Sequence, residues 1–95
     1  MTNAVIPAEK TLLLVDDDHP FLTRLARAME ARGFEVLMAG SVAEGVAHVK
    51  RSAPSFAVVD LRLADGNGLD VIEALHQARP EARAVVLTGY GNIAT

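Results

Sequence analysis

The segment S-F-A-V-V-D at residues 55–60 decides the fold of this chain. Its apolar residues are consecutive, which is typical of a strand buried on both faces, and they deliver Asp60 to the C-terminal tip of that strand. Two other apolar runs also end in polar side chains: residues 11–15 before Asp16, Asp17 and Asp18, and residues 84–87 before Thr88. Because ligands bind at the carboxyl ends of strands in open α/β sheets, we expect these acids and this hydroxyl to share one edge.

Length and composition limit the chain to one small globular domain. It has 95 residues, of which 51% are hydrophobic, enough for a single core. No stretch reaches the roughly eighteen apolar residues of a membrane helix, and residues 1–10 lack the features of a signal peptide, so we expect a cytoplasmic protein without membrane contact. The absence of cysteine excludes disulfides and cysteine nucleophiles. A net charge of -3 argues against direct nucleic-acid binding through these residues.

Strands and helices are expected to alternate after a flexible leader at residues 1–10. Apolar runs predict strands at 11–16, 34–39, 55–60 and 83–88, and amphipathic patterns predict helices at 21–32, 41–51 and 67–78. Asp18 or His19, followed by Pro20, is typical of the start of the first helix. Ser41 and Glu44 have the spacing of a capping box before the second helix.

This alternating order predicts a doubly wound α/β fold with a parallel sheet. Right-handed crossovers and an interior first strand lead to the flavodoxin-like strand order 2-1-3-4. The first connection runs in the opposite direction from the later ones, so one helix covers one face of the sheet and two helices cover the other. One helix is too little to bury a face of four strands. We therefore expect residues 11–95 to form an incomplete domain that lacks a fifth strand and its last helices.

The acidic edge predicts a metal site. The first and third strands are neighbours at the switch point of this order, so Asp16, Asp17 and Asp60 should converge. Two carboxylates about 4 Å apart repel by about 4 kcal/mol at an effective dielectric constant of about 20, and a cation would relieve that repulsion. Oxygen ligands favour Mg²⁺, which keeps positions for water and phosphate oxygens. Together with a hydroxyl, such a site suits phosphoryl transfer, in which an aspartate can be the nucleophile.

Four short motifs fall in order on the expected elements: V-D-D-D at residues 15–18, V-V-D-L-R-L at 58–63, D-G-N-G-L at 65–69 and V-L-T-G at 86–89. With these motifs the chain resembles the receiver domain of two-component response regulators, which has the CheY-like fold. More narrowly, residues 60–70 and 87–95 resemble the RegA/PrrA/ActR group of bacterial redox-responding transcriptional regulators. The resemblance implies a phosphoacceptor protein, not an enzyme, that controls a DNA-binding output domain absent from this chain.

The resemblance also implies roles for the residues of the acidic edge. By it, Asp60 accepts a phosphoryl group from a histidine kinase, and the Thr88 hydroxyl hydrogen-bonds the phosphoryl group afterwards. By the same resemblance, Mg²⁺ is held by four groups: the carboxylates of Asp16, Asp17 and Asp60 and the backbone carbonyl of Arg62.

Two features depart from the receiver pattern. The family carries a lysine at the end of a fifth strand, a position that falls beyond Thr95, and the loop after Asp60 has Ala64 where proline is common. One alternative is therefore an inactive fragment that only folds and self-associates. It would form a homodimer or an element-swapped oligomer through the open edge of its last strand.

A second alternative is an aspartate-nucleophile phosphohydrolase of the haloacid dehalogenase type. That enzyme family has D-x-D after one strand and a threonine after a later strand, and Asp16, Asp18 and Thr88 imitate this pattern. Against it, Pro20 stands where the enzymes have threonine, and Asp60 would have no role.

Overall fold

The structure is a computed structural model, and it describes residues 9–87. Four strands form one parallel sheet: β1 (Thr11–Val15), β2 (Glu35–Ala39), β3 (Phe56–Asp60) and β6 (Arg83–Leu87). The helices that connect them are α1 (His19–Glu30), α2 (Val42–Ser52) and α3 (Leu69–Ala78). No helix within the described range is long and apolar enough to cross a membrane.

The strand order β2-β1-β3-β6 is the doubly wound order predicted from the sequence. Neighbouring strands are parallel, and β1 pairs with β2 on one side and with β3 on the other. The register of β1 and β3 places Val15 beside Val59, so Asp16, which follows β1, and Asp60, the last residue of β3, lie at the same edge of the sheet. The switch point of the sheet is thus between β1 and β3, where ligands bind in folds of this kind.

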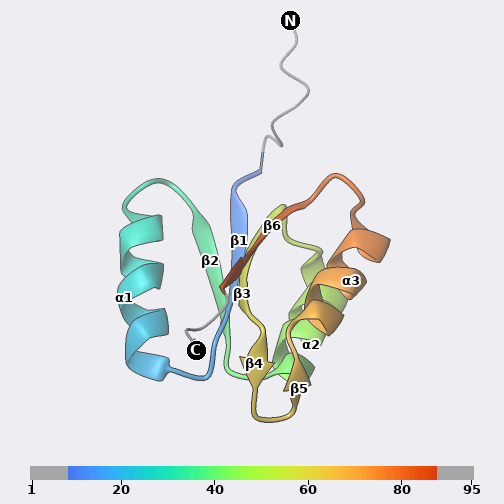
Figure 1. Cartoon of the computed structure of the whole chain (residues 1–95). Helices are drawn as coiled ribbons and strands as arrows, with labels where there is room; N and C mark the ends of the chain where they lie inside the picture. Colours follow the sequence, from blue (N-terminus) through green and yellow to red (C-terminus); the bar gives the residue numbers. More distant parts are fainter. Residues whose placement is uncertain (1–8, 88–95) are drawn as a thin grey trace, which may run out of the picture.

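Residues of β1 alternate between two hydrophobic cores. In Figure 1, α1 lies on one side of the sheet, and α2 and α3 lie on the other. Leu13 and Val15 belong to the core under α2 and α3, whereas Leu12 and Leu14 belong to the core under α1. None of these side chains is more than 2% exposed, because helices cover both faces of this strand. The prediction that β1 is buried on both faces is therefore confirmed.

The α1 side of the sheet is covered less completely than the opposite side. The rings of Phe34 and Phe56 pack edge to face there, with centroids 5.6 Å apart. An apolar groove of about 280 Å³ remains on this side, lined by Leu12, Met29, Phe34, Phe56, Ala57, Val58, Arg83 and Val85. Val85 in β6 is 58% exposed. Within residues 9–87, a single helix therefore leaves part of this face uncovered, as predicted from the strand order.

Local capping bonds determine where α1 and α2 begin. Asp18 caps α1, as predicted, by accepting a hydrogen bond from Phe21 N at 3.1 Å. The helix therefore includes His19 and Pro20, two residues before the amphipathic pattern at 21–32. In α2, Ser41 Oγ accepts from Glu44 N at 3.1 Å, as expected in a capping box. The Glu44 carboxylate accepts in return from Gly40 N at 2.7 Å, one residue before the cap.

Gly45 lets α2 approach α3 and β1 closely. A Cβ atom at this position would lie 3.0 Å from Val71 Cγ2 in α3 and 3.3 Å from Val15 Cγ2 in β1. In a densely packed interior, contacts this short force neighbouring side chains to move. Glycine costs about 1 kcal/mol relative to alanine within a helix, and this close packing offsets part of that cost.

The segment after β3 differs from its prediction. The loop expected after Asp60 contains a short antiparallel hairpin formed by β4 (Arg62–Leu63) and β5 (Gly66–Asn67). Asn67 Oδ1 accepts a hydrogen bond from Leu69 N at 2.8 Å, and α3 begins two residues later than predicted. Leu63 is 9% exposed and belongs to the core under α2 and α3, so it anchors the hairpin to the rest of the domain.

Candidate functional site

Three carboxylates gather at the carboxyl edge of the sheet. Asp16 and Asp17 follow β1, and Asp60 is the last residue of β3. One oxygen atom from each carboxylate lies within 4.8 Å of the others. The fold thus brings together the acids that the sequence predicted to converge, because β1 and β3 are neighbours and end at the same level.

Hydrogen bonds within the following turns hold two of these carboxylates. Asp16 Oδ1 accepts from Asp18 N at 2.9 Å, and Asp60 Oδ1 accepts from Arg62 N at 3.2 Å. Asp16 is 8% exposed, Asp60 is half-buried, and Asp17 is exposed. The cluster is therefore partly held by the surrounding chain and open to solvent through Asp17.

The crowding of carboxylates affects the ionisation of Asp16. Burial raises the pKa of Asp16 above its usual range, and nearby negative charge acts in the same direction, from Asp60, Asp17 and Asp18. The hydrogen bond from Asp18 N opposes the rise. An ionised carboxylate at position 16 therefore costs folding free energy unless a cation compensates it.

The chemistry of the cluster fits a hard divalent cation. Within the described range, the ion pairs join Arg79 to Glu9 and to Glu81, and none includes an acid of the cluster. Mg²⁺ prefers oxygen ligands and usually binds one or two carboxylates together with water and phosphate oxygens. The oxygen-only donor set found here matches that preference.

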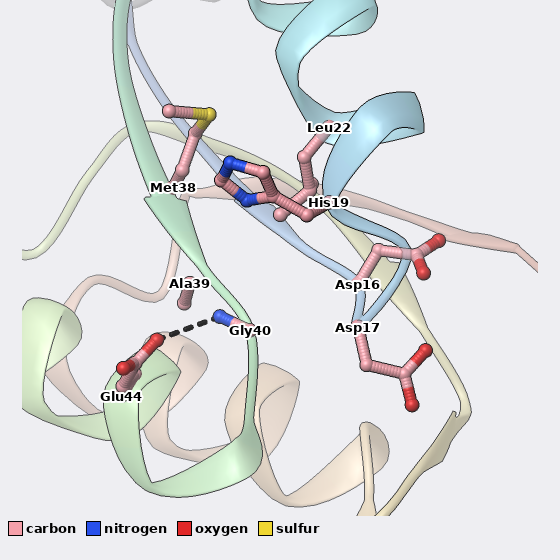
Figure 2. A pocket seen from close by; sticks show the side chains of 8 residues that line it. All are labelled: Asp16, Asp17, His19, Leu22, Met38, Ala39, Gly40 and Glu44. Atoms are coloured by element: carbon pink, nitrogen blue, oxygen red, sulfur yellow. Dashed lines mark hydrogen bonds between the residues drawn. The ribbon is translucent and has the colours of Figure 1, made fainter.

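A hollow of about 410 Å³ opens beside the carboxylate cluster. Its lining comes from the ends of β1 and β2 and the starts of α1 and α2: Asp16, Asp17, His19, Leu22, Met38, Ala39, Gly40 and Glu44. Figure 2 shows His19 and Met38 toward one end of the hollow, and Glu44, bonded to Gly40 N, toward the other. Two acids of the cluster, Asp16 and Asp17, are therefore accessible from the side of β2.

Gly68 packs directly against the strand that carries Asp60. A Cβ atom at this position would overlap the Asp60 carbonyl oxygen and lie 2.7 Å from Val59 Cγ1. Gly68 N also donates a hydrogen bond to Leu61 O at 2.9 Å, which closes the loop around the hairpin. This close approach was not predicted from the sequence, because it depends on the loop folding back onto β3.

The other residues proposed for the site lie in different surroundings. Arg62 is in β4, and its N–H contacts the Asp60 carboxylate, so its backbone adjoins the cluster. Asp18, which the phosphohydrolase alternative uses, caps α1 with its carboxylate. Thr88 lies outside the described residues.

Comparison with known proteins relates the chain to a set of bacterial regulators. The sequence matches the response regulator receiver domain over residues 12–95. It is 63% identical to the photosynthetic apparatus regulatory protein RegA of Rhodobacter capsulatus over 92 residues, which cover 97% of this chain and 50% of RegA. It is 64% identical to the acid tolerance regulatory protein ActR of Rhizobium meliloti (strain 1021) over 91 residues, which cover 96% of this chain and 47% of ActR. The chain thus spans about half the length of these curated relatives.

Solved structures have a similar fold. A response regulator protein from Burkholderia pseudomallei, determined with a phosphorylated aspartic acid, a calcium ion and citrate, matches with a TM-score of 0.81 and 38% identity. This match covers 90% of the present chain and 50% of the other. The beryllofluoride-activated NtrC4 receiver domain dimer matches with a TM-score of 0.77 and 26% identity, over 88% of this chain and 69% of that one.

Proposed function

This chain belongs to the response regulator receiver domain family, and on that basis we propose that Asp60 accepts a phosphoryl group from a histidine kinase. The observation that best supports the proposal is the meeting of three carboxylates at the tip of β3, with one oxygen of each within 4.8 Å of the others. Receiver domains of transcription regulators are not classical enzymes, so family membership argues against the phosphohydrolase alternative with Asp16 and Asp18.

The proposed transfer is a substitution at phosphorus. An oxygen of the Asp60 carboxylate attacks the phosphorus atom of a phosphohistidine, and the new O–P bond forms as the P–N bond breaks. The electron pair of the broken bond leaves with the imidazole, which takes up a proton. Arg62 N holds Asp60 Oδ1 by a hydrogen bond, so we assign the attack to the other carboxylate oxygen.

We propose Mg²⁺ as the cofactor of this reaction. Its ligands would be the carboxylates of Asp16, Asp17 and Asp60 and the backbone carbonyl of Arg62. When bound, the ion neutralises charge on the phosphoryl oxygens. The raised pKa of Asp16 supports this assignment, because burial makes an ionised carboxylate costly at this position without a neighbouring cation.

The proposed output of the receiver is transcriptional control in the cytoplasm. RegA and ActR are regulatory proteins, and this chain matches about half of their length, so a DNA-binding output domain in the remaining half is the proposed effector. The net charge of -3 supports placing DNA contact outside these residues. A second copy of the chain is a further proposed partner, since the NtrC4 receiver neighbour is a dimer.

Labelling with acetyl phosphate tests the phosphoacceptor. The full-length wild type should gain a hydroxylamine-sensitive phosphoryl group with Mg²⁺ and should remain unlabelled with EDTA, as measured by intact-protein mass spectrometry. Asp60→Asn should abolish labelling. Asp70→Asn, which changes an exposed carboxylate in the first turn of α3, should be labelled like the wild type. Labelling that persists in Asp60→Asn but is lost in Asp16→Asn would overturn the assignment.

A further inference from the structure

The carboxylate of Asp65 joins the hairpin after Asp60 to the start of α2. Asp65 lies in the turn between β4 and β5, and its two oxygens accept hydrogen bonds from Val42 N at 2.9 Å and from Ala43 N at 3.1 Å. These donors are 23 and 22 residues away along the chain. One exposed side chain thus connects two segments that are distant in the sequence.

This contact is not required to give α2 a cap. Ser41 Oγ accepts from Glu44 N at 3.1 Å, and Glu44 Oε1 accepts from Gly40 N at 2.7 Å, so the helix has a capping arrangement of its own. Asp65 binds the other N–H groups of the first turn, where a helix N-terminus favours negative charge. Because α2 is already capped, the main effect of the Asp65 contact is to fix the position of the hairpin relative to α2.

The hairpin needs such a restraint because its ladder is short. β4 and β5 pair through two residue pairs, and an isolated ladder of this size is marginally stable. Leu63 anchors β4 in the core, and Asp65 holds the turn that follows. Between Asp60 and these two anchors lies Arg62, whose N–H donates to Asp60 Oδ1 at 3.2 Å. Restraining the turn therefore restrains the peptide groups next to the acidic cluster.

We propose that Asp65 is a positioning residue of the phosphoacceptor site, which fastens the hairpin turn to α2 and so holds the backbone of Arg62 beside Asp60. The inference rests on the proposed function, in which the Arg62 carbonyl is a Mg²⁺ ligand and its N–H holds the acceptor carboxylate. The hydrogen bonds from Val42 and Ala43 also lower the pKa of Asp65, because both bonds favour the ionised carboxylate.

The test compares Asp65→Ala and Asp65→Asn in the full-length chain with two matched controls. Ser41→Ala removes the helix's own cap without touching the hairpin, and Asp70→Ala removes an exposed carboxylate of α3. The measurements are the Mg²⁺ Kd by calorimetry, the melting temperature in EDTA, and amide hydrogen exchange of residues 61–68 in EDTA.

Asp65→Ala should weaken Mg²⁺ binding roughly tenfold, at the lower end of the losses seen when residues that orient metal ligands are removed. It should also speed amide exchange at Arg62 and Gly68. Asp65→Asn should lose less Mg²⁺ affinity than Asp65→Ala, because its amide oxygen still accepts one hydrogen bond. Ser41→Ala should lower the melting temperature and leave the Kd and the exchange of residues 61–68 unchanged.

Two results would overturn the inference. An unchanged Kd and unchanged exchange in Asp65→Ala would show that the contact does not hold the hairpin. An equal loss of Mg²⁺ affinity in Ser41→Ala would show that the effect comes from the stability of α2. An equal loss in Asp70→Ala would show that it comes from the removal of a negative charge. If the wild type bound no Mg²⁺, the proposed function would fail, and exchange at Arg62 in EDTA would still decide whether Asp65 positions the hairpin.

Discussion

At the scale of single residues, the position of Asp60 depends on a neighbour without a side chain. A methyl group at Gly68 would overlap the Asp60 carbonyl oxygen. We expect Gly68→Ala to lower the free energy of unfolding by about 1–3 kcal/mol, the usual cost of overpacking, as measured by urea denaturation. Phosphorylation by acetyl phosphate should also slow, because relief of the overlap displaces the acceptor strand.

Gly40→Ala is the control for this substitution. Its Cβ atom would meet Glu44 Oε1 at 3.7 Å, an ordinary contact distance. We expect this variant to keep wild-type stability. Equal losses of stability in Gly40→Ala and Gly68→Ala would contradict the close-approach explanation.

The buried carboxylate of Asp16 links stability to pH and to Mg²⁺. Its pKa is raised in the folded state, so ionisation of Asp16 lowers the free energy of unfolding. This cost is absent below the unfolded pKa and grows as pH rises from the unfolded toward the folded value. We expect Mg²⁺ to compensate this loss at neutral pH. At about ten times its Kd, the ion should add about 1.4 kcal/mol, as measured by thermal unfolding with Mg²⁺ and with EDTA.

Asp16→Asn separates the two contributions. Without the buried charge, this variant should be more stable than the wild type in EDTA and should gain less from Mg²⁺. A wild-type melting temperature that does not change at millimolar Mg²⁺ would contradict the proposed metal site.

At the scale of elements, a buried hydroxyl joins the amino ends of β1 and β3. Ser55 is fully buried, its Oγ donates to Glu9 O at 2.9 Å, and its N–H donates to Thr11 Oγ1 at 2.9 Å. We expect Ser55→Ala to lower the free energy of unfolding by about 1–3 kcal/mol. Removing the hydroxyl leaves its buried hydrogen-bond partners without a bond, and an unsatisfied buried polar group costs about this much. Urea denaturation measures the loss.

Ser52→Ala provides the comparison for Ser55. The Ser52 hydroxyl is exposed at the end of α2, where it donates to His48 O at 3.3 Å, so water can replace this bond. The change should therefore be small. A loss as large as that of Ser55→Ala would refute the role of burial in the β1–β3 contact.

Local patterns predicted the helices and the four strands of the parallel sheet, and the differences arise at their ends. Asp18 caps α1 as predicted, so this helix extends two residues before its amphipathic pattern. The third helix begins at Leu69, two residues later than predicted, where Leu69 N donates to Asn67 Oδ1. The β4–β5 hairpin was not predicted, since strands of two residues carry no periodicity. Burial of Leu63 in the shared core holds it instead.

At the scale of the whole molecule, uneven coverage of the sheet predicts self-association. The apolar groove of about 280 Å³ and the 58% exposed Val85 lie on the face that α1 covers incompletely. We expect the 95-residue chain to form homodimers or element-swapped oligomers at high concentration, as measured by light scattering. Val85→Glu should shift this equilibrium toward the monomer.

Leu69→Glu is the matched control for Val85. Leu69 is 50% exposed but lies on α3, on the opposite side of the sheet, so its replacement should leave the association unchanged. A wild-type chain that remains monomeric at high concentration and still unfolds cooperatively would refute the prediction.

Sequence was sufficient for the features that depend on near neighbours or on the order of elements. Apolar runs and caps predicted the strands and helices, and the strand order brought Asp16, Asp17 and Asp60 to one edge, as found. The role of Thr88 stays a prediction, because this residue lies outside the described range. Periodicity and capping act over a few residues, and right-handed crossovers restrict the possible strand orders. The elements and their order in the sheet can therefore be inferred from the sequence.

Three-dimensional packing was needed for contacts between residues distant along the chain. The bond of Asp65 to the start of α2, the fit of Gly45 against Val71 and that of Gly68 against Asp60 belong to this class. Each depends on the distance between two elements, which the whole core determines through close packing. A local pattern contains no information on that distance, and for this reason the residues that support the acidic site emerged only from the folded chain.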